Sequence, residues 1–144
     1  MWRAALLLAL LLGAGCARQP AAQQTAPVPV DPFADGKVIF QTGRDREGVQ
    51  IVARSTPLYS RCAACHRADG SGGMHLPGGA VSADLRYKAL VTDQRHPYNL
   101  RLLERAISTG IDNDGQPLDE VMPRWKLSQR DLHDVAQYVL VKLK

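Results

Sequence analysis

The chain has 144 residues, enough for one folded domain and a tail. The chain carries 18 Lys and Arg residues and 14 Asp and Glu residues, so its net charge is a mild +4. No run of basic residues is present, which excludes an extended nucleic-acid-binding stripe. Because only 6% of the residues are aromatic, a domain of this size builds a modest core from its own side chains.

The N-terminus is typical of an export signal. A short cationic start precedes the apolar run 4–12, which is shorter than the roughly 20 residues that span a bilayer. The small residues 13–15 then precede Cys16, as in the lipobox of bacterial lipoproteins, although Gly13 stands where an aliphatic residue is usual. We expect residues 1–15 to be removed and Cys16 to be lipidated, the alternative being ordinary cleavage nearby.

A tether is expected to follow the signal. Residues 16–34 contain four prolines among Ala, Gln and Val and have no hydrophobic periodicity, which is typical of a semi-extended linker. We expect this stretch to connect the lipid anchor to a folded domain at residues 35–144. The three cysteines fit the division, because one is assigned to lipid and two remain for a cofactor.

The beginning of the folded domain predicts a short N-terminal β-hairpin. Apolar residues alternate on both sides of the polar, glycine-bounded stretch 43–48, with Val38 and Phe40 before it. A helix is then expected to begin at Thr56 and Pro57, with the threonine as N-cap and the proline at the first helical position. This helix would lead into the motif that follows.

The motif Cys62-Ala63-Ala64-Cys65-His66 is the attachment signature of c-type haem. Two thiols three residues apart on a helical turn reach the two vinyl groups of one porphyrin, and His66 follows as the proximal iron ligand. A zinc site would need two more ligands at short spacing, and the other histidines are scattered. A redox dithiol would lie at a helix start within a βαβ pattern, which the flanking sequence lacks. The motif therefore predicts covalent haem attachment through Cys62 and Cys65.

The rest of the chain predicts two further helices separated by loops. Residues 69–79 hold five glycines and predict a loop. A helix is expected from Pro97 to a stop at Gly110, and residues 112–115 predict a turn, because the spacing and terminal glutamate of an EF-hand are absent. The last helix is capped by Ser128 and carries an apolar stripe at helical spacing.

The second axial position of the iron has several candidate ligands. Met122 lies in a non-helical segment before the last helix, where Pro123 stiffens the backbone and suits a thioether aimed at iron. A place in the core is the commonest role of methionine and is the alternative for Met122. The competing ligands are Met74, in the glycine-rich loop, and a bis-histidine arrangement through His75 or His96.

With these motifs in view, the sequence over residues 56–144 resembles the class I c-type cytochromes. The resemblance implies a mainly α fold with helices wrapped around one covalently attached haem c. It also implies that Met122 is the distal ligand and that the Pro77 carbonyl accepts a hydrogen bond from the proximal imidazole. The segments that carry the resemblance occur in the family's order: Cys62–His66, Asp69–Gly72, Pro77, Met122–Pro123, Leu127–Ser128 and the closing helix with Tyr138.

Two positions depart from the family's pattern. The glycine that usually stands eight residues before the first cysteine, where the terminal helices cross, is replaced by Arg54. The aromatic residue that usually stands four before that cysteine is replaced by Leu58, with Tyr59 one place late. We therefore expect an altered crossing of the first and last helices and unchanged haem ligation.

The resemblance implies an electron carrier and not an enzyme, because the protein fills both axial positions of the iron. The expected partners are membrane complexes of a respiratory chain, such as a quinol-oxidising complex and a terminal oxidase or reductase. The expected location is the periplasm or the outer side of the cytoplasmic membrane, held by the lipid anchor. Two other classes stay open: a haem c subunit that accepts electrons within a periplasmic dehydrogenase, and a gas sensor or peroxidase with an open iron.

Overall fold

The computed structural model describes residues 32–55 and 57–144, so the export signal, Cys16 and residues 17–31 lie outside the described part of the chain. The described part is mainly helical, which confirms the predicted fold class. Its elements in chain order are α1 (Pro32–Thr42), β1 (Val52–Ala53), α2 (Ala63–His66), the 3₁₀ turn η1 (Pro77–Gly79), the π-helical turn η2 (Lys88–Thr92), α3 (Leu100–Thr109), β2 (Trp125–Lys126) and α4 (Gln129–Lys142).

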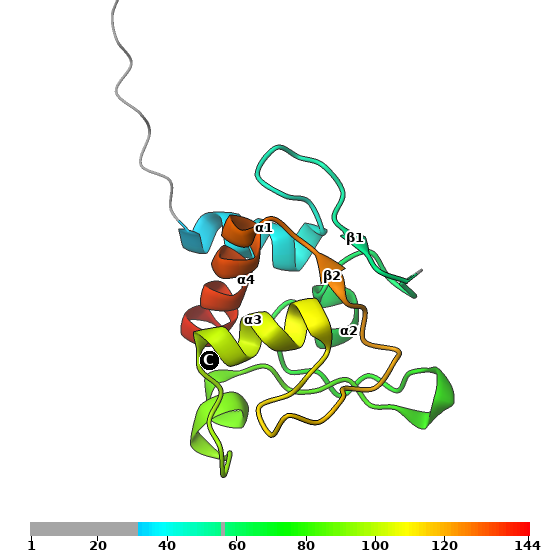
Figure 1. Cartoon of the computed structure of the whole chain (residues 1–144), viewed down its shortest axis with the longest axis vertical. Helices are drawn as coiled ribbons and strands as arrows, with labels where there is room; N and C mark the ends of the chain where they lie inside the picture. The colour runs from blue at the N-terminus through cyan, green and yellow to red at the C-terminus, as the bar shows by residue number, and fades with distance from the viewer. Residues whose placement is uncertain (1–31, 56) are drawn as a thin grey trace, which may run out of the picture.

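The crossing of α1 and α4 forms one side of the hydrophobic core (Figure 1). Gly36 makes the crossing close, since a Cβ there would lie 2.7 Å from the Cβ of Tyr138. One turn later Phe40 is fully buried, and its ring centroid lies 5.7 Å from that of Tyr138. An aromatic pair at this distance contributes about 1 kcal/mol beyond the area that it buries. A glycine and an aromatic residue four positions apart therefore hold the two helices together.

The structure corrects the predicted hairpin. Val38 and Phe40 lie in α1, so the first arm is a helix and not a strand. The helix ends at Thr42, and Gly43 follows it with a φ of +70°, which is typical of a residue just after a helix C-terminus. The chain does reverse after this point, because an isolated antiparallel bridge joins Arg44 to Gln50. Three residues of apolar alternation are too few to separate a strand from a buried helical turn.

Residues 43–61, named the insertion below, join α1 to the cysteine motif and are fastened at two places. The Arg46 guanidinium donates to Asp134 of α4 at 2.7 Å and to Asp131 at 3.4 Å. Further along, β1 pairs antiparallel with β2, with Ala53 opposite Trp125. The insertion is thus attached both to α4 and to the segment that precedes α4.

The helix expected to begin at Pro57 is absent from the described part of the insertion. Residues 57–62 form bends and a turn, and α2 begins only at Ala63, while Thr56 lies outside the described residues. The physical reason is local. The Gln50 side-chain amide donates to the Ser60 carbonyl at 2.9 Å, which occupies an oxygen that a continuing helix would use.

The two longer C-terminal helices follow the predicted end signals. The Asn99 side chain caps α3, so this helix starts three residues later than Pro97, and Gly110 ends it with a φ of +73°. The Ser128 hydroxyl accepts the Asp131 N–H at 3.1 Å, which confirms the predicted cap of α4. Among the helices of residues 32–55 and 57–144, none is both long enough and apolar enough to cross a membrane.

Candidate functional site

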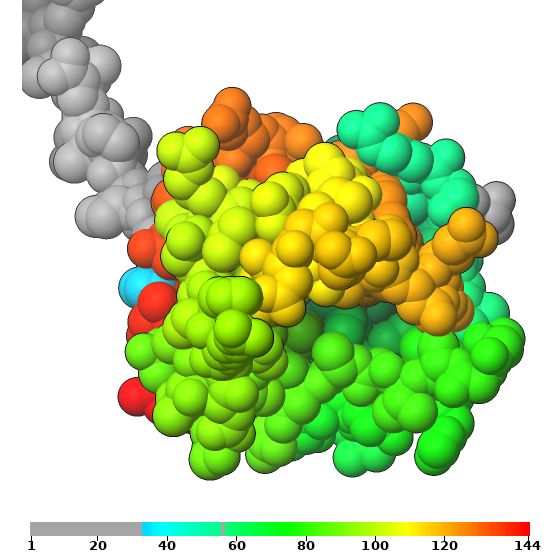
Figure 2. All heavy atoms as spheres, turned by 60° about the horizontal axis from the view of Figure 1, so that its bottom comes forward, coloured from blue at the N-terminus to red at the C-terminus, as the bar shows by residue number. Residues whose placement is uncertain are grey.

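A cavity of about 320 Å³ lies between the cysteine motif and the segment that precedes α4, a volume within the range of small-molecule sites. Figure 2 shows its opening as a hollow between the yellow-to-orange surface of residues 110–122 and the green surface of residues 75–85. Its walls are mainly apolar and draw on buried side chains from the three longer helices and from β2, including Phe40, Leu103, Val139 and Trp125.

Both cysteines of the motif line this cavity from one helical turn. The His66 N–H donates to the Cys62 carbonyl at 2.9 Å, which closes the turn and places residues three apart on one face. Burial raises the pKa of the Cys62 thiol to about 12 and also raises the pKa of the Cys65 thiol. A redox dithiol or a thiolate metal site needs lowered thiol pKa values, so the environment favours neutral thiols.

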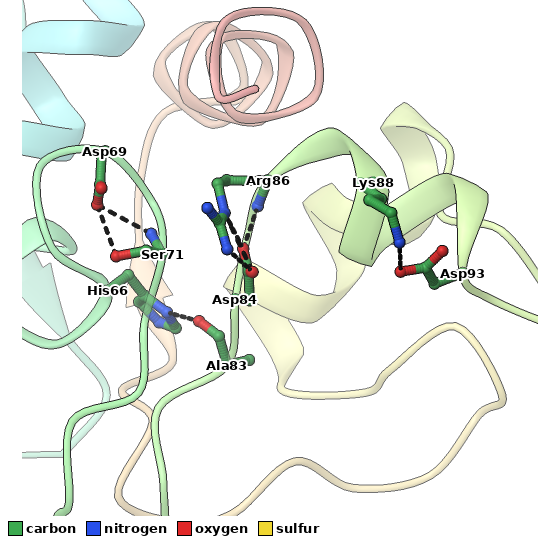
Figure 3. Close-up of polar contacts among 8 residues, drawn as sticks. All are labelled: His66, Asp69, Ser71, Ala83, Asp84, Arg86, Lys88 and Asp93. Carbon is green, nitrogen blue, oxygen red and sulfur yellow. Dashed lines mark hydrogen bonds and ion pairs between the residues drawn. The ribbon is translucent and has the colours of Figure 1, made fainter.

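The His66 side chain is buried, lines the same cavity and is oriented by one hydrogen bond (Figure 3). Its Nδ1 lies 2.8 Å from the Ala83 carbonyl oxygen. Because a carbonyl can only accept, Nδ1 carries the proton and the lone pair of Nε2 is left for a metal. Burial lowers the pKa of His66, which keeps the ring neutral as metal ligation requires.

The role predicted for Pro77 is wrong. The carbonyl that accepts from the imidazole is that of Ala83, and Pro77 begins the exposed turn η1. The glycine-rich loop reaches forward and returns through an antiparallel bridge between His75 and Val81, so Ala83 comes back beside the motif while Pro77 lies at the far end of the excursion. The Ala83 carbonyl orients the imidazole ring of His66, which is the role predicted for the carbonyl of Pro77.

The segment that carries Ala83 is held on both flanks. The Ser82 hydroxyl donates to the Cys65 carbonyl at 2.8 Å, which joins the segment to α2. On the other flank the Asp84 carboxylate accepts from the backbone N–H of Arg86 at 2.9 Å and from its guanidinium (Figure 3). The hydrogen bond from Arg86 lowers the pKa of Asp84. The Ala83 carbonyl is therefore fixed by its two neighbours.

Met122 lines the same cavity as the cysteine motif, with buried Trp125 nearby in the wall. The three competing ligands, Met74, His75 and His96, are not among the residues that line this cavity in the described part of the chain. The structure thus brings together Cys62, Cys65, His66 and Met122, and leaves Met74, His75, His96 and Pro77 outside.

This donor set fits a haem. Two thiols on one turn, a neutral imidazole with a free lone pair and a thioether surround one apolar cavity, and these are the groups that hold and ligate c-type haem. The arrangement defines a protein that carries a covalently attached porphyrin.

The cytochrome c family model matches residues 33–141, and the chain belongs to the cytochrome c family. A search of curated proteins finds no match to the chain. Membership in the family means covalently bound haem c and haem-based electron transfer.

The family match includes most of α1, whereas the resemblance visible in the sequence motifs begins only at residue 56. In the family a glycine and an aromatic residue stand four positions apart, at places that correspond to Arg54 and Leu58 when counted back from the first cysteine. In this chain Gly36 and Phe40 have that spacing. The prediction of an altered helix crossing is wrong, because this pair makes the close contact with α4 and the insertion separates it from the motif. The spacing of Gly36 and Phe40 is the sequence signal by which α1 could be recognised. No sequence signal marks the Ala83 carbonyl as the acceptor for His66, since every residue carries a backbone carbonyl.

Proposed function

We propose that this protein is a single-haem electron carrier in which His66 and Met122 are the axial ligands and Cys62 and Cys65 form the thioether bonds. The observation that carries the proposal is that these four side chains line one apolar cavity. Bound haem supplies a one-electron couple between Fe(II) and Fe(III).

The protein's own groups determine how that couple behaves. The Ala83 carbonyl fixes the ring of His66 and increases its basicity. The apolar walls exclude water, and the Met122 thioether favours the reduced state, so both raise the reduction potential. With both axial positions taken by side chains, a substrate has no free coordination position, which favours electron transfer over catalysis.

The proposal is tested on the full chain matured in a host that makes c-type cytochromes. The mass should exceed that of the processed chain by one haem, and the oxidised protein should show the weak absorption band at the red edge that marks thioether ligation. The band should disappear in Met122→Ala and persist in Met74→Ala, a matched methionine outside the cavity. Rapid carbon monoxide binding by the reduced wild type would instead indicate an open iron and contradict His/Met ligation.

The proposed location is the outer side of the cytoplasmic membrane of a bacterium, with Cys16 carrying the lipid. A tethered carrier has a raised effective concentration near membrane redox complexes, which suits shuttling between a quinol-oxidising complex and a terminal oxidase or reductase. Cys16→Ser should release the haem protein from membranes without changing its spectrum. Wild-type protein that washes off membranes as readily as Cys16→Ser would refute the anchor.

An electron-accepting subunit of a periplasmic oxidoreductase is the second candidate. It is favoured by apolar side chains that the insertion leaves exposed: Val49, Val52 and Leu58 are 59%, 57% and 50% exposed. A catalytic chain would cover such a surface. Isolation of the tagged protein from native membranes distinguishes the two, because a permanent subunit copurifies in fixed ratio with a catalytic chain and a shuttle does not.

A further inference from the structure

The side chain of Arg124 binds the segment that presents Met122. Its Nη1 donates to the Asp119 carbonyl at 2.9 Å and to the carbonyl of Met122 itself, and its Nη2 donates to the Leu118 carbonyl at 2.7 Å. One guanidinium thus binds three backbone oxygens within residues 118–122, which we name the methionine loop. This use of a rigid planar fork of donors is specific to arginine.

The guanidinium packs closely against the end of α3. Gly110 ends that helix, and a Cβ at this position would lie 2.6 Å from Nη2 of Arg124 and closer still to Nε and Cζ. The Gly110 carbonyl also accepts the Leu118 N–H at 2.8 Å. The end of α3 therefore supplies both the space for the guanidinium and a hydrogen bond to the start of the methionine loop.

The backbone of Arg124 is held from the side of the insertion. The Arg54 N–H donates to the Arg124 carbonyl at 2.9 Å, next to the pairing of Ala53 with Trp125. Arg124 is not among the residues that line the cavity, whereas its guanidinium donates to three carbonyls of the methionine loop.

We propose that Arg124 is a positioning residue for the distal ligand, which keeps the methionine loop in the one conformation that presents the Met122 sulfur to the iron. The role rests on the proposed function, because it requires Met122 to be the axial ligand. Hydrogen bonds from a charged donor are stronger than neutral ones, so losing three of them should populate an open iron at least about tenfold more.

Three variants of the full, matured chain test the role. Arg124→Lys keeps the charge and loses the planar fork, Arg124→Met removes both, and Gly110→Ala disturbs the guanidinium without changing it. Each should weaken the red-edge band and speed carbon monoxide binding to the reduced protein about tenfold or more. Each should also keep one haem by mass, because the cysteine motif is untouched.

Two matched controls accompany them. Gly115→Ala adds a methyl group at a glycine of similar backbone conformation, with φ of +82°, that has open space around it. Lys126→Ala removes a neighbouring exposed charge. Both should keep the wild-type band and the wild-type carbon monoxide rate.

The outcomes separate this inference from the proposed function. The proposed His/Met ligation and the role of Arg124 are both refuted if the wild type lacks the red-edge band or if Met122→Ala keeps it. A wild-type band lost in Met122→Ala but unchanged in all three test variants overturns the role of Arg124 alone. Wild-type behaviour of Arg124→Lys beside a defective Arg124→Met overturns it as well, since the charge and not the fork would then act. If Arg124→Met fails to fold, Arg124→Lys and Gly110→Ala decide.

Discussion

The cysteine motif and the methionine loop line the same cavity, but different kinds of contact hold them in place. On the motif side, His66 binds the Ala83 carbonyl and Ser82 binds the Cys65 carbonyl, each across 17 positions of chain. On the other side, β2 begins three residues after the end of the methionine loop, and it pairs with β1 of the insertion. The insertion is in turn fastened to α4 by Arg46 across 88 positions.

The difference teaches which side of the site can form by itself. Contacts that close short loops cost little chain entropy, so the motif and its returning segment need few distant partners. The methionine loop contacts the end of α3 and Arg124, and the backbone of Arg124 binds the insertion, so all three must be folded before the loop can take its native conformation. We therefore expect changes on the motif side to act on haem attachment, and changes on the loop side to act on the ease with which Met122 leaves the iron.

The largest expected effect comes from removing both thiols. Cys62→Ala with Cys65→Ala should abolish covalent attachment, because no other cysteine lines the cavity in the described part of the chain. The measurement is haem staining after denaturing electrophoresis, with intact mass as the second readout. Met122→Ala is the matched control on the loop side and should keep full staining. An equal loss of haem staining in the double cysteine variant and in Met122→Ala would show that the cysteine motif and the methionine loop do not differ in this way.

Removing the anchor of the insertion should have the next largest effect. Arg46→Gln removes the cation that Asp131 and Asp134 of α4 share with Asp35 of α1, and burial already raises the pKa of Asp134. Losing this shared cation should lower the free energy of unfolding, because the neighbouring carboxylates then face one another with less compensating charge. Denaturant unfolding of the haem protein measures this loss.

The same variant tests how far the methionine loop depends on distant contacts. Arg46→Gln should also speed carbon monoxide binding while leaving haem staining unchanged. Arg44→Gln is the control, because Arg44 is exposed and its guanidinium donates to the Gly48 carbonyl, which also lies in the insertion. A destabilised Arg46→Gln with a wild-type carbon monoxide rate would show that the insertion does not support the loop.

A pair of neighbouring glycines probes the orientation of His66. A Cβ on Gly72 would clash with the Ala83 carbonyl, whereas the same atom on Gly73 meets nothing within 4 Å, although both residues have positive φ. Gly72→Ala should therefore lower the free energy of unfolding by about 2 kcal/mol more than Gly73→Ala does. It should also raise the reduction potential, because a weakened hydrogen bond makes the imidazole a poorer donor to Fe(III). Equal potentials in the two variants would contradict this role of the Ala83 carbonyl.

The parts of the fold that the sequence predicted well are those with local signals. Cys62–His66 forms a helical turn on the cavity wall because its spacing alone sets the geometry, and Ser128 caps α4 because one hydroxyl satisfies one N–H. The stop of α3 at Gly110 is of the same kind, since the left-handed conformation there suits glycine.

The parts that could not be predicted depend on partners far along the chain. The pattern at Val38 and Phe40 predicts a strand where the structure has α1, because the feature that defines this helix, the fit of Gly36 against α4, involves residues about 100 positions away. The contact of Ala83 with His66 depends on the path of a glycine-rich loop, which the sequence leaves open. Nothing in the sequence indicates that the Arg124 guanidinium donates to three carbonyls of the preceding residues 118–122.

The smallest expected effect concerns the flank of Ala83 and has a defined pH dependence. The hydrogen bond from Arg86 lowers the pKa of Asp84 from its ordinary value of 3.8. A carboxyl whose pKa is lower in the folded state stabilises the fold above that ordinary value, and this share of the stability is lost as the pH falls below it. Asp84→Asn removes the share at every pH. It should therefore cost less than about 1 kcal/mol near pH 6 and less still near pH 3.

The measurement is denaturant unfolding of the wild type and Asp84→Asn at both pH values. Asp93→Asn breaks the exposed pair with Lys88 drawn in Figure 3 and serves as the control for the loss of a surface ion pair. The reduction potential of Asp84→Asn should stay that of the wild type, because Ser82 still ties the segment to Cys65 on its other flank. A deficit that grows toward pH 3 would contradict the lowered pKa of Asp84 in the folded state. A changed reduction potential would show that Ser82 alone does not fix the Ala83 carbonyl against His66.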